Sequence, residues 1–187
     1  HTSMNDYYDY IINSKGITLG TGHRFSRYIT GYLSYGFSNN TYEINDINST
    51  YLNSQYLESY AKSAITATVK YDSTDDFYLP RKGMVISQSI EKAGLGGDVD
   101  FVKSRTTFGK YVGLEDYIGF DAIARYKARY HNLSGGGYLP LAEKFYMGGI
   151  GSVRGYESYS LSPTVADSAA TDGLRRIGGT QTFSNSL

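Results

Sequence analysis

Hydrophobic and polar residues alternate along several stretches of the chain, as they do in β-strands that have one apolar face. The clearest stretch runs from Tyr117 to Tyr130, where every even-numbered position holds an apolar or aromatic residue and all four charged residues are at odd-numbered positions. A period of two over fourteen residues predicts a strand rather than a helix. Strands of soluble proteins usually have about 3 to 10 residues, so this length favours a strand that crosses a bilayer.

Weaker alternation predicts further strands on both sides of this stretch. In residues 60–71, Ile65 and Val69 share one face while Thr66 and Thr68 share the other. Five more segments are predicted as strands: 16–25, 28–38, 83–93, 100–112 and 180–187. The pattern in residues 100–112 is mixed and does not indicate which face points outward. The total is about six or seven strands.

The links between these strands differ in length in a regular way. In chain order they are Ser26-Arg27, residues 40–58, 72–82, 94–99, 113–116 and 131–180. Short and long links roughly alternate, as in a transmembrane β-barrel that has tight turns on its inner side and longer loops on its outer side. A soluble sandwich has no reason to sort its loops in this manner.

Composition narrows the fold class. The 187 residues include 22 Gly and 20 Tyr but no Cys or Trp, and 18 basic residues balance 18 acidic ones. Such a chain is rich in strand and poor in helix, and it contains no apolar run of 18 residues that could form a transmembrane helix. A soluble antiparallel β-domain and a membrane barrel with interfacial Tyr both fit. The long strands favour an all-β fold, an antiparallel transmembrane β-barrel segment.

Charge and residue usage exclude several functions. The zero net charge argues against nucleic acid as a partner, and the lack of Cys excludes thiol nucleophiles and disulfide scaffolds. The three His are too scattered to predict a metal site, and no catalytic pattern is present, so neither an enzyme nor a cofactor is expected. Five basic residues could form a polyanion-binding strip, although a solvated barrel lumen explains them more simply: Lys62, Lys70, Arg125, Lys127 and Arg129.

Three motifs occur in a fixed order. A glycine-rich segment within the last long link holds Gly148, Gly149, Val153, Arg154, Gly155 and Tyr156. An acidic turn about 70 residues earlier holds Asp72, Asp75, Asp76, Pro80 and Gly83. The third motif is Gly178-Gly179, just before the last predicted strand. Together they resemble the loop motif Val-Arg-Gly-Phe/Tyr, the inner-side turn and the strand re-entry of the BamA-like outer-membrane assembly factors, a superfamily of polypeptide-transport barrels.

The resemblance implies a 16-stranded barrel, of which residues 1–187 are a partial domain holding about strands six to twelve. Soluble N-terminal repeats and the closing strands are expected in other parts of a longer protein. The loop of about residues 131–180 is expected to fold back into the lumen, where Arg154 contacts acidic residues of the wall. Asp121 is a candidate partner because its parity in the clearest strand points inward. A buried guanidinium requires such a carboxylate.

The resemblance also implies a function. The intact protein is expected to fold and insert β-barrel proteins in the bacterial outer membrane, without a cofactor. Its expected partners are unfolded outer-membrane protein clients, the lipid bilayer and, through the soluble repeats, accessory assembly lipoproteins. One alternative is a TamA-like or two-partner secretion translocation barrel. Alternatives of another class are a passive porin and a soluble β-sandwich binding domain.

Overall fold

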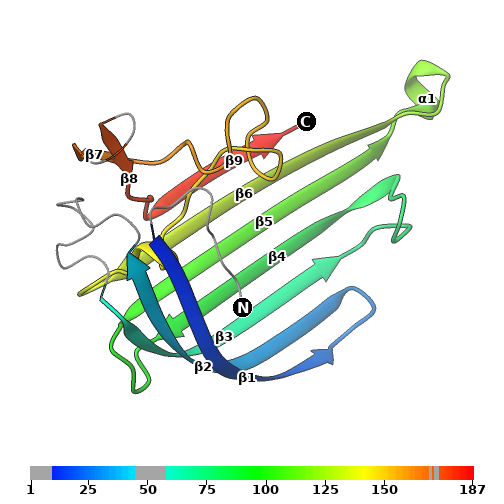
Figure 1. Cartoon of the computed structure of the whole chain (residues 1–187). Coiled ribbons are helices and arrows are strands. Elements are labelled where there is room, and N and C mark those ends of the chain that lie inside the picture. Colours follow the sequence, from blue (N-terminus) through cyan, green and yellow to red (C-terminus); the bar gives the residue numbers. More distant parts are fainter. Residues whose placement is uncertain (1–9, 45–57, 169, 171–172) are drawn as a thin grey trace.

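The computed structural model describes residues 10–44, 58–168, 170 and 173–187. Its main feature is a curved antiparallel sheet of seven strands in the order β1-β2-β3-β4-β5-β6-β9 (Figure 1). The strands are β1 (Tyr10–Arg24), β2 (Ile29–Ile44), β3 (Tyr60–Asp72), β4 (Lys82–Ala93), β5 (Phe101–Gly113), β6 (Ile123–Gly135) and β9 (Gln181–Ser186). The prediction of an all-β antiparallel fold with six or seven strands is confirmed.

Strand length agrees with a membrane-spanning sheet. The first six strands have 12 to 16 residues, whereas about 9 to 11 residues suffice for a tilted strand to cross a bilayer. Smaller elements are α1 (Glu115–Ile118), the 3-10 turn η1 (Leu141–Glu143), and the hairpin of β7 (Thr164–Ala166) and β8 (Leu174–Arg176). No helix in the described part of the chain has the length and apolar character needed to cross a membrane.

The two faces of the sheet differ in chemistry. Leu33 pairs with Ala67 and Ala67 with Ile90, so these side chains share one face, here called the outer face. Leu33 is 54% exposed and Ile90 is 48% exposed. The opposite, inner face carries polar pairs such as Thr66 and Glu91. Large exposed apolar side chains on one face and polar ones on the other are expected where lipid bathes the outside and water the lumen.

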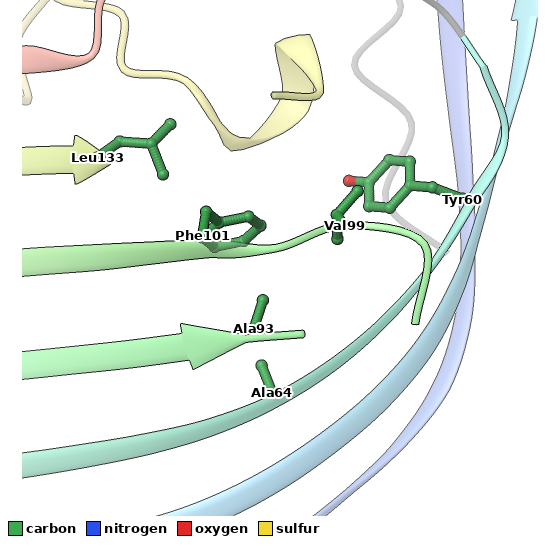
Figure 2. Close-up of a cluster of buried hydrophobic side chains, with 6 residues drawn as sticks. All are labelled: Tyr60, Ala64, Ala93, Val99, Phe101 and Leu133. Carbon is green, nitrogen blue, oxygen red and sulfur yellow. The ribbon is translucent and has the colours of Figure 1, made fainter. Parts of the chain in front are cut away.

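A small buried cluster lies on the inner face, where β3 to β6 approach the longer loops. Figure 2 shows its members: Tyr60, Ala64, Ala93, Val99, Phe101 and Leu133. Tyr138, Leu139 and Phe145 of the connection between β6 and β9 pack against this cluster. The long loop therefore folds back over the inner face. Within the described residues the only other paired strands are β7 and β8, so no second sheet covers the outer face.

The predicted strand of residues 117–130 is wrong in its first part. Tyr117 and Ile118 belong to α1, which ends at Gly119 in the left-handed conformation (φ 75°), and β6 begins only at Ile123. Phe120 lies in the turn and is 64% exposed. The even-odd pattern of this part is a coincidence of composition, because a left-handed glycine reverses the chain where a strand would continue.

The other boundaries shift less. Strands β1 and β2 extend further toward the longer loops than the predicted 16–25 and 28–38, and the last loop begins after Gly135 rather than at residue 131. The register settles the orientation of the mixed strand: Phe108 pairs with Ile86 and shares its face, while Phe101 is buried on the inner face. Residues 45–57 of the predicted long link 40–58 lie outside the described residues.

Candidate functional site

The tip of the long loop, residues 148–156, is a compact turn shaped by glycine. Gly148 and Gly149 have positive φ angles of 112° and 83°. A Cβ atom on Gly148 would lie 2.2 Å from the backbone oxygen of Glu157, so no larger residue fits there. The N–H of Gly148 donates to Oγ of Ser152, and this hydroxyl donates to the carbonyl of Gly148, both at 2.8 Å.

The remaining motif residues complete this turn. Val153 is half-buried and forms a backbone bridge with Gly149. Gly155 has a φ of 87°, which favours glycine. The carbonyl of Tyr156 accepts the N–H of Gly149 at 2.9 Å, and the Tyr156 side chain is 55% exposed. The motif therefore holds its shape through local backbone contacts, which leaves its side chains free to meet other groups.

The tip lies beside β6 on the inner face. Nη1 of Arg129 donates to the carbonyl of Gly151 at 2.6 Å. A recess of about 310 Å³ separates the tip from β6 and β9, and its basic lining residues are Arg125, Lys127, Arg129 and Arg154. Four cations around one recess create a strongly positive potential, which attracts a carboxylate or another anion.

Arg154 itself is exposed. Among the described residues no carboxylate lies within ion-pair distance of it. The candidate partner Asp121 precedes β6, is exposed, and lies 2.5 Å from Nη2 of Arg81. The Arg81 guanidinium also lowers the pKa of Asp121 below its usual range. The expectation that Asp121 points inward from a strand is therefore wrong, and a wall carboxylate for Arg154 stays a prediction.

The acidic turn between β3 and β4 is built by side-chain hydrogen bonds to backbone. Oδ1 of Asp75 accepts the N–H groups of Arg81 and Lys82 at 2.9 and 3.0 Å. These N–H groups, that of Lys82 foremost, hold the pKa of Asp75 below its usual range. Oδ1 of Asp76 accepts the N–H groups of Tyr78 and Leu79 at 2.7 and 2.8 Å. This is the Asx-turn chemistry that makes Asp common in turns.

The ends of the same turn are fixed as well. Oδ1 of Asp72 accepts the N–H of Thr74 at 3.2 Å, and Pro80 lies two residues before Lys82, the first residue of β4. Gly83 has a φ of 111°, and a Cβ atom there would lie 2.3 Å from the backbone oxygen of Ser73. Asp75, Asp76 and Pro80 thus sit in the turn, while Asp72 and Gly83 lie in the adjoining ends of β3 and β4. The hydrogen bonds of the three carboxylates to backbone N–H groups are those of a structural turn.

A charged cluster at the base of the loop was not predicted from sequence. Oε1 of Glu143, in η1, lies 2.7 Å from Nζ of Lys62, and its Oε2 forms an ion pair with Lys103. Nζ of Lys62 also lies 3.1 Å from Glu91, and the hydroxyl of Tyr60 donates to Glu143 at 3.4 Å. Burial raises the pKa of Glu143, but Lys103 and Lys62 outweigh this effect, so the pKa lies below its usual range.

One signal in the sequence could have identified Glu143 as part of the site. Glu143 is the only acidic residue between His131 and Tyr156, a segment expected to enter a lumen lined by lysine and arginine. The same loop holds a second buried ion pair, between Arg175 of β8 and Asp167, at 2.6 Å. The ion pairs of Glu143 and of Asp167 therefore fix parts of the loop that lie outside the glycine-rich motif.

Comparisons with known proteins agree with this geometry. The chain matches the Omp85 superfamily domain over residues 1–187. It is 32% identical to the outer membrane protein assembly factor BamA of Nitratidesulfovibrio vulgaris over 164 residues, which are 87% of this chain and 18% of that protein. It is 31% identical to the human sorting and assembly machinery component 50 homolog over 110 residues, 54% of this chain and 22% of that protein. The chain thus spans about a fifth of the length of these relatives.

A solved structure shares the fold. The crystal structure of BamA from Haemophilus ducreyi lacking POTRA domains 1–3 superposes with a TM-score of 0.79 at 18% identity, over 94% of this chain and 36% of that one. Long strands with an apolar outer face, a loop folded over the inner face and a match along the whole chain lead to one conclusion. The chain belongs to the Omp85 superfamily.

Proposed function

We propose that this chain is part of an outer-membrane protein assembly factor that folds β-barrel proteins and inserts them into the outer membrane. The observation that carries the proposal is the pairing of two features: a sheet with an apolar outer face, and a loop that brings Arg154 over its inner face. The 32% identity to a BamA over most of this chain supports it.

In this proposal residues 1–187 form about strands six to twelve of a 16-stranded barrel. The loop of residues 136–180 occupies the lumen and braces the wall, and the cations around the tip meet carboxylates of the intact barrel. Soluble repeats elsewhere in the parent receive unfolded clients and accessory assembly lipoproteins. The bacterial relative aligns with 87% of this chain and the human one with 54%. This difference favours a bacterial outer membrane.

The proposed mechanism requires backbone chemistry and no catalysis or cofactor. A weakly closed seam of the barrel offers free N–H and C=O groups to an incoming strand, which adds to the sheet edge by β-augmentation. The barrel also perturbs the nearby bilayer, which lowers the barrier to insertion. The seam strands belong to other parts of the parent, and the present sheet is the wall that the loop braces.

The test uses the full-length parent in liposomes. Urea-denatured outer-membrane barrel protein is added, and its folding is followed by the mobility shift of folded barrels in unheated gels. Faster folding than in protein-free liposomes is expected. If the client instead crosses the membrane into the interior of the liposome without inserting, the parent is a translocation barrel. Ion conductance with no effect on clients would indicate a porin, and either result would overturn the proposal.

A further inference from the structure

The inner wall carries an excess of positive charge where the loop meets it. Lys62 of β3, Lys103 of β5 and Arg105 of β5 surround one wall carboxylate, Glu91 of β4. Glu91 pairs with Lys103 in the register and lies 3.1 Å from Lys62 and 4.0 Å from Arg105. With one carboxylate among three cations, this part of the wall has a net positive charge, which a further anion would balance.

Glu143 supplies that anion from the loop. Its carboxylate contacts both Lys62 and Lys103 and accepts a hydrogen bond from Tyr60. Glu143 is 8% exposed and Lys103 is 4% exposed, so both charged groups are buried away from water. A buried ammonium without a partner is costly, whereas one that shares a carboxylate with a second donor is satisfied. The wall therefore forms a receptor for a carboxylate.

The base of the loop is connected to its tip by a ladder of backbone hydrogen bonds. Phe145, two residues after Glu143, exchanges hydrogen bonds with Gly179 at 2.9 and 2.8 Å. Met147 exchanges hydrogen bonds with Leu161 at 3.0 and 2.9 Å. The next rung is the bond from Gly149 to the carbonyl of Tyr156, within the tip. The position of Glu143 is thus transmitted to the motif.

The tip of the loop makes weaker contacts with the wall than the base does. Among the described residues, one side-chain hydrogen bond joins the tip to the sheet, from Nη1 of Arg129 to the carbonyl of Gly151. Arg154 shares its recess with Arg125, Lys127 and Arg129, and like charges repel one another. Within the described part of the chain, the ion pairs between the loop and the sheet all lie at the base of the loop.

We infer that Tyr60, Lys62 and Lys103 form a carboxylate-binding site on the inner wall, that Glu143 is its resident ligand, and that this contact positions the tip that carries Arg154. Glu143 is a positioning residue: it acts on the motif through the loop backbone. The inference concerns the place of the loop, and it rests on the proposed function only for its consequence for client folding.

The experiment measures hydrogen exchange of loop amides in the full-length parent in bilayers. Glu143→Gln keeps the shape of the side chain and removes its charge. Exchange protection of the Met147 and Gly149 amides is expected to fall by about tenfold or more, because breaking a buried pair leaves two ammonium groups without their partner. Glu157→Gln is the matched control, since Glu157 is an exposed carboxylate in the same loop, and it should leave protection unchanged.

Two further variants separate a specific contact from general damage. Glu143→Asp retains the charge and should retain most of the protection. Adding Lys103→Met to Glu143→Gln removes one of the stranded cations and should restore part of the loss, which is a coupling that a merely structural defect would not show. If Glu143→Gln does not fold, Lys103→Met alone takes its place, and full protection in that variant would overturn the inference.

Other outcomes are equally decisive. Unchanged protection in Glu143→Gln, or an equal loss in Arg154→Ala, would overturn the inference because the base would then not hold the tip. Client folding is measured in the same samples and should fall with protection in Glu143→Gln. A wild-type parent that folds no clients would contradict the proposed function while leaving the exchange result on Glu143 valid.

Discussion

Oε1 of Glu143 lies 2.7 Å from Nζ of Lys62, although 81 positions separate the two residues in the sequence. This pair and the neighbouring pair with Lys103 seat the base of the loop on β3 and β5, the two strands that flank β4. The motif residues lie further out, at a tip surrounded by cations. Attachment and motif are therefore separate parts of the loop, and each can be altered without the other.

Seating of the loop should depend on pH in the acid range. The pKa of Glu143 is lowered in the folded state, so its contribution to seating is complete above the ordinary carboxylate pKa and is lost as pH falls through the lowered value. A spin label on Ile150→Cys, a position that is 89% exposed, should become more mobile in that window. Control variants are Glu143→Gln, which should be mobile throughout, and Glu91→Gln, which removes the other carboxylate of the cluster.

Other titratable groups lie near Glu143, namely Lys62, Lys103 and Tyr60, and the ring of His131 on β6 lies 5.2 Å from that of Phe145. His131→Gln is therefore a further control, and the loss of seating in acid should persist in this variant because Glu143 is untouched. An acid transition that disappears in His131→Gln would contradict the assignment to Glu143.

Charge should be tolerated on one face of β3 and not on the other. Ala67→Arg places a cation on the outer face near the centre of the strand and should destabilise the barrel by about 2–4 kcal/mol in a bilayer. Thr68→Arg, one residue further, places the same side chain in the lumen and should cost much less. Unfolding by denaturant in lipid vesicles measures both. Equal losses would contradict the assignment of the two faces.

Arg154→Ala should impair the parent in a different way. The base of the loop should remain seated, since Glu143 and its lysines are untouched, while client folding and heat resistance of the barrel should fall. Asp121→Asn is the comparison, because Asp121 pairs with Arg81 on an exposed turn, where an ion pair contributes little to stability. If Asp121→Asn reproduced the Arg154→Ala defect, Asp121 would be the partner of Arg154 in the intact barrel.

Gly83→Ala should disrupt the acidic turn. The φ of 111° at Gly83 is unfavourable for alanine by roughly 1–2 kcal/mol, and the new Cβ would clash with the carbonyl of Ser73. Gly136→Ala has open space and an ordinary φ, so it should be close to neutral. Thermal unfolding of the parent in detergent compares the two variants. A Gly83 variant as stable as the Gly136 variant would show that the turn relaxes.

The period of the strands was predictable because successive side chains of a strand point alternately to the lipid and to the lumen. That reasoning identified seven strands and the chemistry of both faces. It failed between Tyr117 and Ala122, where a turn of helix and a left-handed Gly119 happen to follow an even-odd pattern. Periodicity describes the side chains of a regular strand and says nothing about where a glycine reverses the chain.

The candidate site was predictable only in part. The glycines and Arg154 stand out because they form a compact motif, and the turn aspartates stand out because their chemistry is local. Glu143 acts through Lys62 and Lys103, which lie on strands far away in sequence. Such a contact follows from how the loop is folded back over the sheet, and a pattern of neighbouring residues does not contain that information.

The most direct test of the central claim is an accessibility scan of β3 in the full-length parent in bilayers. Single spin labels are placed at residues 64–70, and relaxation by oxygen, which concentrates in lipid, is compared with relaxation by a water-soluble nickel complex. The account predicts alternation, with oxygen favoured at Ile65, Ala67 and Val69 and nickel favoured at Thr66 and Thr68. A uniform profile, or nickel favoured at Ala67, would contradict it.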